Sequence, residues 1–314
     1  MKFAFILDPL DGLKAHKDTS LAIMREAAQR GHELFVAMQG DLLLRQDKVR
    51  LMTRPFRFTQ GVSWHCSGDV TEASPGDFDA VLMRKDPPFD NEFLYSTYLL
   101  ELAVEQGACV LNNPQSVRDW NEKLSVARFP QFAPEFLVTS NNDLIRGFLA
   151  EHGDIVVKPL DGMGGSSVFR LHSTDHNISV ILETITNFSR RTIMVQRYLP
   201  EIKIGDKRII VIDGEPLPYA LARIPKAGET RGNLAAGGTG VAQPLTKRDR
   251  EIARTVGAAL KQKGLFLVGL DVIGEHLTEI NVTSPTGMVE IAAQTDCNPA
   301  AVFMDALEQE CASA

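Results

Sequence analysis

The sequence predicts an α/β protein in which a helix-covered parallel sheet is followed by α+β subdomains. Near the N-terminus, short buried-type strands alternate with an amphipathic helix, an order typical of such a sheet. In the second half of the chain, glycine-rich loops and antiparallel hairpins take over. With 314 residues, of which 44% are hydrophobic and 23% charged, the chain can form two or three subdomains around a substantial core.

The composition argues against several kinds of partner and site. A formal net charge of -7 argues against nucleic acid held mainly through its phosphates. The four cysteines are far apart and form no C-x-x-C pair, so neither a zinc site nor a disulfide framework is indicated. The first apolar run meets Asp8 too early for a signal peptide, and no run approaches the roughly twenty apolar residues of a membrane span. We therefore expect a cytoplasmic protein with no nucleic-acid or membrane partner.

The N-terminal segment reads as strand, loop, helix and strand. Lys2–Leu7 is a buried-type strand, and Glu33–Met38 is the next one. Between them Asp18 is a helix N-cap and Gly31 ends the helix. Ligands of open α/β sheets gather beyond the carboxyl ends of strands, so the loop before Asp18 is a candidate pocket edge. No G-x-G-x-x-G is present there, which argues against a dinucleotide site.

A third strand, Ala80–Met83, runs into Arg84-Lys85-Asp86 and two prolines. The prolines end the strand and leave two cations and a carboxylate, Arg84 among them, where a ligand could meet them; a solvated charged loop is the alternative. Residues 41–77 indicate only short strands and turns. Farther along, the pattern predicts a helix over Tyr95–Gln106, a strand over Cys109–Asn112 and a helix over Pro114–Phe129.

A glycine loop follows the strand Asp154–Lys158. Residues 159–167 read P-L-D-G-M-G-G-S-S, and a further strand is expected over Val168–Leu171. Glycines let backbone N–H groups approach phosphate oxygens, and Lys158 supplies a positive charge beside them. The order differs from a Walker A motif, because the lysine precedes the glycines and a strand follows them. A flexible hairpin is the alternative interpretation of the glycines alone.

The next strand and hairpin carry further candidates. Thr192–Gln196 leads into Arg197-Tyr198-Leu199-Pro200, an extended hinge that could hold a planar base, although a core tyrosine is the alternative. Asp213-Gly214 is a strong hairpin signal between Lys207–Ile212 and Leu217–Arg223. That hairpin brings Arg208 and Arg223 into one neighbourhood.

A long glycine-rich loop spans residues 225–240. It contains five glycines and little that can be buried, and loops of this length are usually disordered or functional lids. Arg231 in mid-loop would reach a developing phosphate charge once such a lid closes. An amphipathic helix over Thr246–Lys263 follows, and a surface helix over about Asn298–Gln309 ends the chain.

A hairpin near the C-terminus carries a candidate metal site. Leu267–Ile273 and Leu277–Val282 are strands, and a three-residue turn over 274–276 would set Asp271 opposite Glu279. Side chains two apart share a strand face, so Asn281 would point the same way as Glu279. Hard cations such as Mg²⁺ prefer oxygen ligands of this kind, although an outward polar face is the alternative.

The order of these parts resembles the ATP-grasp superfamily, and four strings narrow the resemblance to the prokaryotic glutathione synthetases. These are M-R-K-D-P-P-F-D (83–90), K-P-L-D-G-M-G-G (158–165), G-E-T-R-G-N-L-A-A-G-G (228–238) and T-E-I-N-V-T-S-P-T (278–286). The resemblance implies an N-terminal α/β domain over 1–122, an ATP-grasp lid subdomain over 123–200 and a catalytic subdomain over 201–314, with the nucleotide between the last two.

The resemblance also implies site roles. Lys123, Lys158 and the loop glycines Gly162, Gly164 and Gly165 would contact the phosphates of ATP. Gln196, Tyr198 and Leu199 would hold adenine, and Asp206 would contact the ribose or another part of the nucleotide. Mg²⁺ or Mn²⁺ would bind Asp271, Glu279 and Asn281. The catalytic arginines would be Arg208, Arg223 and Arg231, with Arg84, Ser284 and Thr286 toward the peptide substrate.

The implied reaction uses ATP to join γ-glutamylcysteine to glycine through an acyl phosphate. The resemblance also implies a homo-oligomer, namely a tetramer. Two alternatives stay open. Another ATP-grasp ligase, of the D-alanine–D-alanine or glutamate-adding type, would share the nucleotide machinery. A non-catalytic ATP-sensing module would bind ATP without turning it over.

Overall fold

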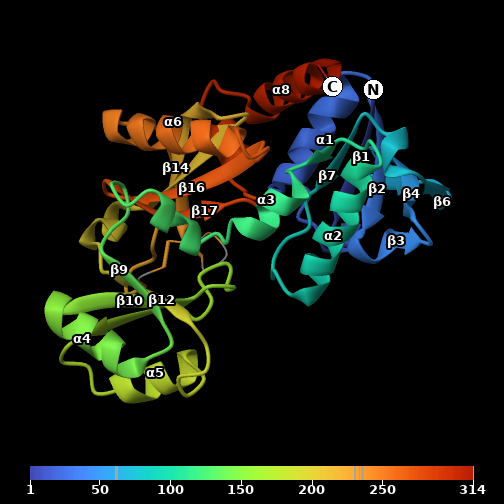
Figure 1. Ribbon diagram of the computed structural model, residues 1–314. Helices are drawn as coiled ribbons and strands as arrows, with labels where there is room; N and C mark the ends of the chain where they lie inside the picture. The colour runs from blue at the N-terminus through green and yellow to red at the C-terminus, as the bar shows by residue number, and fades with distance from the viewer. Residues whose placement is uncertain (61–62, 230, 233, 235–236, 314) are drawn as a thin grey trace.

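The computed structural model describes the whole chain except residues 61–62, 230, 233, 235–236 and 314. Its strands form three sheets, which follow one another along the chain (Figure 1). The first sheet uses residues 2–111, the second residues 136–197 and the third residues 206–281. Within the described residues, no helix is long and apolar enough to cross a bilayer.

The first sheet has a parallel centre, as predicted. β1 (Lys2–Leu7) pairs in parallel with β2 (Glu33–Met38) and β7 (Ala80–Met83), and β7 pairs in parallel with β8 (Val110–Leu111). Residues 41–77 extend it beyond β2 with antiparallel strands, of which β4 is longer than expected: β3 (Leu42–Arg45), β4 (Lys48–Phe58), β5 (His65–Ser67) and β6 (Thr71–Ala73).

Helices cover both faces of the first sheet. Phe3 and Phe5 of β1 belong to the same hydrophobic cluster as the inner face of α1 (Thr19–Gln29). Ala4 and Ile6, which point the other way, cluster with α2 (Asn91–Glu105). Asp18 caps α1 by accepting a hydrogen bond from the Leu21 N–H, as the sequence predicts.

The second sheet is antiparallel and has its own helical layer. Its strands run in the order β11-β10-β12-β9, and two helices pack with them around a separate cluster of buried aliphatic side chains (Figure 1). The elements are β9 (Phe136–Thr139), α4 (Asn142–His152), β10 (Asp154–Pro159), β11 (Phe169–His172), α5 (Ile178–Ile185) and β12 (Ile193–Arg197).

The third sheet is also antiparallel, in the order β15-β14-β13-β16-β17. The Asp213-Gly214 turn has positive φ at both residues, which matches the predicted hairpin. The elements are β13 (Asp206–Ile212), β14 (Glu215–Ile224), β15 (Thr239–Pro244), α6 (Lys247–Lys261), β16 (Leu267–Ile273), β17 (His276–Asn281), α7 (Met288–Gln294) and α8 (Pro299–Ser313).

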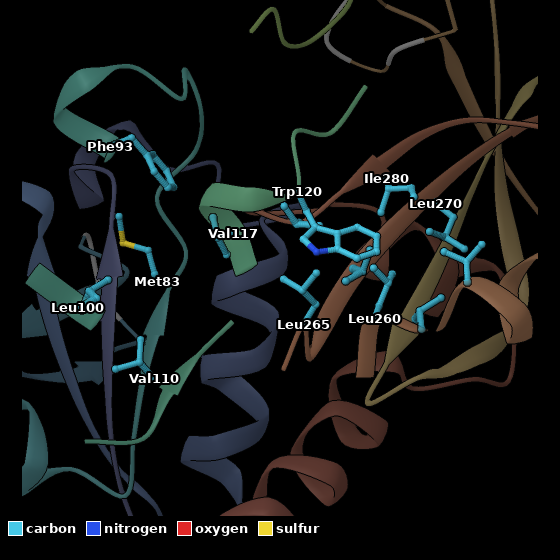
Figure 2. Close-up of a cluster of buried hydrophobic side chains, with 14 of the residues drawn as sticks. Met83, Phe93, Leu100, Val110, Val117, Trp120, Leu260, Leu265, Leu270 and Ile280 are labelled. Carbon is cyan, nitrogen blue, oxygen red and sulfur yellow. The ribbon is translucent and has the colours of Figure 1, made fainter. Parts of the chain in front are cut away.

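The first and third sheets share hydrophobic cores. One cluster runs from Met83 and Phe93 in the N-terminal part, past Val117 and Trp120, to Leu270 and its neighbours in the third sheet (Figure 2). A second cluster joins β1 and α1 to α7 and α8. Although α8 comes last in the chain, it lies against α1 beside the N-terminus (Figure 1).

Three predicted elements differ from the observed ones. The helix expected over Pro114–Phe129 ends as α3 (Pro114–Asp119), and a separate 3-10 turn covers Leu124–Arg128. The break arises because the Asn121 side chain accepts hydrogen bonds from the N–H groups of Lys123 and Leu124, which starts a new turn. α2 begins four residues before Tyr95, capped by Asp90.

The third difference is the strand expected over Cys109–Asn112, which shortens to two residues. The side chain of Asn112, which would end that strand, turns instead toward the backbone of the third sheet. The elements β9, α4, α5, β15 and α7 are additions that the sequence pattern does not predict.

Candidate functional site

A cavity of about 330 Å³ lies between the second and third sheets. Seventeen of the eighteen predicted site residues line it, and Arg84 is the exception. The seventeen are Lys123, Lys158, Gly162, Gly164, Gly165, Gln196, Tyr198, Leu199, Asp206, Arg208, Arg223, Arg231, Asp271, Glu279, Asn281, Ser284 and Thr286. Residues from distant parts of the sequence are therefore brought to one place.

The β16–β17 hairpin supplies the acidic wall of this cavity. Asp271 stands opposite Glu279, as predicted, but the turn is shorter than expected because Ile273 pairs with His276. A bulge at Thr278 restores the predicted pairing. The bulge is tied in place by a hydrogen bond of 3.1 Å from Thr278 Oγ1 to Asp271 O.

Asp271 is the centre of a buried ion network. Arg208 donates to both of its carboxylate oxygens, at 2.5 and 3.1 Å, and Arg223 lies 2.9 Å from Oδ2. Arg223 also pairs with Asp206 at 2.5 Å. The hairpin around Asp213-Gly214 therefore does bring Arg208 and Arg223 together, and a single carboxylate joins them.

The pKa values of the two carboxylates in this network, Asp271 and Asp206, are shifted in opposite directions. Burial disfavours the ionised form of Asp271, but Arg208 and Arg223 overcome it and hold the pKa of Asp271 well below its usual range. At Asp206 burial dominates, and Asp271 adds repulsion, so the pKa of Asp206 rises to about 6 despite Arg223. Among the described residues, no group donates to the buried Oδ1 of Asp206.

Two lysines converge on Glu279. Lys158 Nζ lies 3.0 Å from Glu279 Oε1, and Lys123 Nζ lies 3.9 Å from the same atom. Burial opposes ionisation of Glu279, yet the two lysines lower the pKa of Glu279 below its ordinary value. Lys123 also donates to the carbonyl of Gly162, at 2.6 Å, and so links the 3-10 turn to the glycine loop.

The glycine loop is shaped by close backbone approaches. A Cβ added at Gly162 would lie 2.8 Å from Pro159 Cγ, which is closer than side chains tolerate. Gly164 and Gly165 have φ values of 61° and 79°, in the left-handed region that favours glycine. Conformation and space at these positions therefore favour glycine, independently of any ligand.

The far end of the cavity is more apolar. Gln196 pairs with Val156 across β10 and β12, and Tyr198 and Leu199 follow at the end of β12. The guanidinium of Arg170 lies 3.8 Å from the Tyr198 ring centroid, so Tyr198 is not a core side chain. The Nε2 group of Gln196 is buried and donates to no described residue. Apolar walls with an unused amide donor suit a planar heterocycle.

Arg84 does not reach the cavity wall, whereas Asp86 and Pro87 of the same charged loop do. It is 6% exposed, and its guanidinium donates to Ser20 Oγ at 3.1 Å and to the carbonyls of Thr283 and Pro285 at 3.4 and 3.1 Å. Arg84 thus supports from behind the turn that carries Ser284. Ser284 itself donates to Asp86 in the cavity.

Arg231 is placed at the entrance by two contacts. Its guanidinium pairs with Glu229 at 2.7 Å and donates to the carbonyl of Gly165 at 3.3 Å. The long loop therefore touches the small glycine loop across the cavity. The predicted lid over 225–240 ends in β15, and its residues 230, 233, 235 and 236 lie outside the described residues.

Glu122 belongs to the site although the sequence pattern does not predict it. Its Oε1 accepts hydrogen bonds from the N–H groups of Val282 and Thr283, at 3.2 and 3.3 Å, and from Thr283 Oγ1 at 2.9 Å. Burial raises the pKa of Glu122, with Lys123 opposing the shift. The signal available in the sequence is an acid directly before Lys123, but its target is more than 150 residues away.

The cavity suits a divalent cation bound together with a polyphosphate. Within the described residues, no three His, Cys, Asp or Glu side chains form a metal cage by themselves. Asp271, Glu279 and Asn281 nevertheless offer oxygen donors on one wall, and Asn281 turns its amide nitrogen away to Gly269 O at 3.2 Å. A Mg²⁺ site of a few carboxylates completed by water and phosphate fits this donor set.

Known protein families and curated proteins are similar to this chain over nearly its whole length. Residues 1–118 match the family model of the prokaryotic glutathione synthetase N-terminal domain, and residues 122–296 match the model of the ATP-grasp domain of the same family. The glutathione synthetase of Nitrosomonas europaea is 60% identical over 99% of both chains. That of Yersinia pestis is 53% identical over 99% of this chain and 98% of its own.

Solved structures at low identity share the fold. D-cycloserine synthetase DcsG superposes with a TM-score of 0.69 at 16% identity, covering 99% of this chain and 100% of its own. D-alanyl-alanine synthetase A from Vibrio cholerae gives 0.64 at 14% identity, covering 100% and 99%. The predicted fold class, an N-terminal α/β domain followed by an ATP-grasp fold, is confirmed. Because both family models match in order and the relatives align from end to end, this chain belongs to the prokaryotic glutathione synthetase family.

Proposed function

We propose that this protein is an ATP-dependent ligase that joins γ-L-glutamyl-L-cysteine to glycine, forming glutathione and releasing ADP and phosphate. The observation that carries the proposal is the cavity between the second and third sheets. It gathers the lysines, arginines, carboxylates and glycine loop that phosphoryl transfer to a carboxylate needs. The full-length identity to glutathione synthetases supports the choice of substrates.

The nucleotide is assigned to one end of the cavity. Adenine occupies the apolar end beside Tyr198 and Leu199, where the Gln196 amide is available to donate. Asp206 lines the same cavity and is assigned to the ribose. Lys123, Lys158 and the glycine loop are assigned to the phosphates. Both ammonium groups converge on one anionic atom, Glu279 Oε1, so they stand close enough together to bind one phosphate group.

Charge balance supports a bound divalent cation. Among the described residues that line the cavity, seven lysines and arginines stand beside five aspartates and glutamates, an excess of only two formal positive charges. The side chains alone therefore leave little net positive charge for a triphosphate. Bound Mg²⁺ or Mn²⁺, held by Asp271, Glu279 and Asn281, would supply the missing charge and orient the phosphates.

The residues promote the reaction by positioning and charge cancellation. The cysteinyl carboxylate attacks the γ-phosphorus, and the resulting acyl phosphate is attacked by the glycine amine, which displaces phosphate. Arg208 and Arg223 are fixed by Asp271 before substrate arrives, so little reorganisation is needed when charge develops near them. Ser284 and Thr286 are assigned to the peptide end, and Arg84 to holding their turn from behind. The long loop excludes water, which would hydrolyse the acyl phosphate.

An assay of phosphate release tests this function against its alternatives. With ATP, Mg²⁺ and γ-glutamylcysteine, glycine should support turnover and D-alanine should not. Turnover of D-alanine with D-alanine, or of glutamate additions, would assign the chain to another ligase type. ATP binding with no turnover under any of these conditions would identify a sensing module.

Two further measurements test the metal and the assembly. A chelator should abolish turnover, and Mg²⁺ or Mn²⁺ should restore it. We also propose a cytoplasmic homotetramer. Light scattering after size exclusion should give four times the 34.6 kDa chain mass, and a monomer mass would refute the assembly.

A further inference from the structure

Two cysteines from distant parts of the chain meet beside the first residue of β7. Cys109 precedes β8, and its carbonyl accepts a hydrogen bond of 2.8 Å from the Val81 N–H. Cys311 lies in the last turns of α8, and its Sγ is 3.4 Å from the carbonyl oxygen of Asp79. Asp79 and Val81 flank the first residue of β7, so both cysteines are held at the same end of one strand.

The two thiols are close neighbours and are reachable. The side chains of Cys109 and Cys311 lie close enough to influence each other's pKa. Both residues are partly exposed, and both pack against the cluster that joins the first and third sheets. Cys66 is exposed on β5, and Cys297 lies between α7 and α8, so these two provide internal comparisons.

We propose that Cys109 and Cys311 form a redox-active dithiol, which low-molecular-weight disulfides oxidise to an intramolecular disulfide that ties the C-terminal helix to the N-terminal sheet. The contact serves no role in the ligase cavity, since neither cysteine lines it. The proposal therefore stands or falls independently of the ligase activity.

The two thiols have different surroundings. The S–H of Cys311 donates to the carbonyl oxygen of Asp79, 3.4 Å from Sγ, so Cys311 is the resolving thiol. The neighbouring Cys311 side chain lowers the pKa of Cys109, with burial and Glu310 opposing the shift. A thiolate is the attacking form of cysteine, so Cys109 reacts first.

The exchange is balanced with a small disulfide RSSR as oxidant. The Cys109 thiolate attacks one sulfur of RSSR, a Cys109–SR bond forms, and one RS⁻ leaves. Cys311 then loses its proton and attacks Cys109 Sγ, which breaks the Cys109–SR bond and releases the second RS⁻. The two protein thiols lose two electrons, and the two protons end on two molecules of RSH.

The disulfide would close over segments that are already docked. Arg30 of the segment after α1 pairs with Asp305 of α8 at 2.7 Å, and His32 lies 2.7 Å from Glu308. Cys311 lies beyond these contacts, in the turn of α8 nearest the C-terminus, which ends beside the first sheet (Figure 1). A cross-link there restrains the unfolded chain over the long segment between residues 109 and 311, so the oxidised protein should be more heat-resistant.

The test equilibrates the purified full chain with glutathione disulfide, and in parallel with hydroxyethyl disulfide, followed by non-reducing peptide mapping. We expect one linked peptide pair, Cys109–Cys311, in wild type and in a C66S/C297S variant. In C311S, Cys109 should instead stop at the mixed disulfide. Oxidation should raise Tm by roughly 5–10 °C in C66S/C297S and leave the Tm of C311S unchanged.

Three results would overturn the proposal. In the first, Cys109 and Cys311 stay reduced while Cys66 reacts. In the second, each of the two carries its own small-molecule adduct without a link between them. In the third, the linked protein has a Tm equal to or below that of the reduced protein, which would show that the bond strains the fold.

Discussion

At the scale of single residues, Lys158 and Arg231 are two cations of the cavity with different contacts. Lys158 ends a strand, is 5% exposed and contacts Glu279 on the cavity floor. Arg231 belongs to the long loop and contacts Glu229 and the glycine loop at the entrance. We therefore expect Lys158 to contact bound ATP throughout the cycle and Arg231 to act when charge develops on the phosphoryl group.

This difference predicts separable losses. Lys158→Ala should weaken ATP binding itself. Arg231→Ala should leave ATP affinity nearly unchanged and lower kcat on the order of 10²–10³-fold, as expected for the loss of one preorganised donor. Calorimetry of ATP binding beside steady-state rates distinguishes the two. An Arg231→Ala enzyme with normal kcat, or with no ATP binding, would show that Arg231 has another role.

Glu279 is the residue whose charge the proposed metal site needs most. Glu279→Gln keeps the shape of the side chain but removes a ligand charge that Lys123 and Lys158 stabilise. Turnover should be abolished while the circular dichroism spectrum and the fold are retained. The matched control is Glu275→Gln in the turn of the same hairpin, which should keep wild-type activity. Glu279→Gln turnover within a few-fold of wild type would reject the metal assignment.

Because of Asp206, we expect the free energy of unfolding to depend on pH. The pKa of Asp206 is about 6 in the folded protein and about 3.8 when unfolded, so its ionisation costs folding free energy. Protonated Asp206 makes its full contribution to the free energy of unfolding below pH 3.8. That contribution is lost as the pH rises through 6, a change of roughly 3 kcal/mol.

Unfolding of ligand-free wild type and Asp206→Asn should be compared between about pH 4.5 and 7.5, a range that spans the folded-state pKa. Over this window the stability of wild type relative to the variant should fall with rising pH. A difference that does not change with pH would mean that Asp206 stays ionised throughout.

At the scale of elements, the two loops that touch over the cavity should respond to ligands together. The residues of the long loop include Lys226 and Arg231, both sites for trypsin. ATP with γ-glutamylcysteine should slow cleavage after these residues, because exclusion of water from the acyl phosphate requires a closed loop. Mass spectrometry of timed digests measures both sites. Cleavage after Lys48, far from the cavity, is the internal control and should not change. A closing lid would be contradicted if ligands protected Lys48 as much as the loop sites, or if they protected neither.

At the scale of the whole molecule, the three sheets are not equally independent. The first and third sheets share two hydrophobic clusters. The second has a cluster of its own and, among the described residues, its strands reach one of the shared clusters only through Met194 of β12 and Phe136 and Val138 of β9. Asn112 strengthens the joined part, since its buried side chain donates to Leu267 O at 2.9 Å and Val282 O at 2.7 Å and accepts from Leu267 N. The lid subdomain should therefore open without the rest.

Matched substitutions test this division. Asn112→Ala leaves buried backbone groups unpaired and should lower the stability of the joined part by roughly 2–4 kcal/mol. Asn141→Ala removes the N-cap of α4 and should cost about 1 kcal/mol, confined to the second sheet and its helices. Hydrogen exchange read by region measures both. Equal destabilisation of all regions by either variant would show a single cooperative unit.

The sequence by itself determined many of the local elements, and all but one of the site residues predicted from it line the cavity. Strand and turn signals specify register over short distances, which is why the pairing of Asp271 with Glu279 follows from the sequence of one hairpin. That pairing holds despite a shorter turn than predicted, because the bulge at Thr278 compensates for the difference. The metal, nucleotide and arginine roles remain predictions, although their residues lie together.

Tertiary structure decided what depends on contacts between distant segments. No local pattern shows that Arg84 turns inward to the 283–285 backbone, that Glu122 holds the same turn, or that Cys109 meets Cys311. The helix predicted over 114–129 breaks for a related reason: the Asn121 side chain bonds backbone N–H groups, and Trp120 is buried in the core between two sheets. Periodicity reports which face of an element is apolar, whereas the partner of that face is set by how the sheets pack against one another.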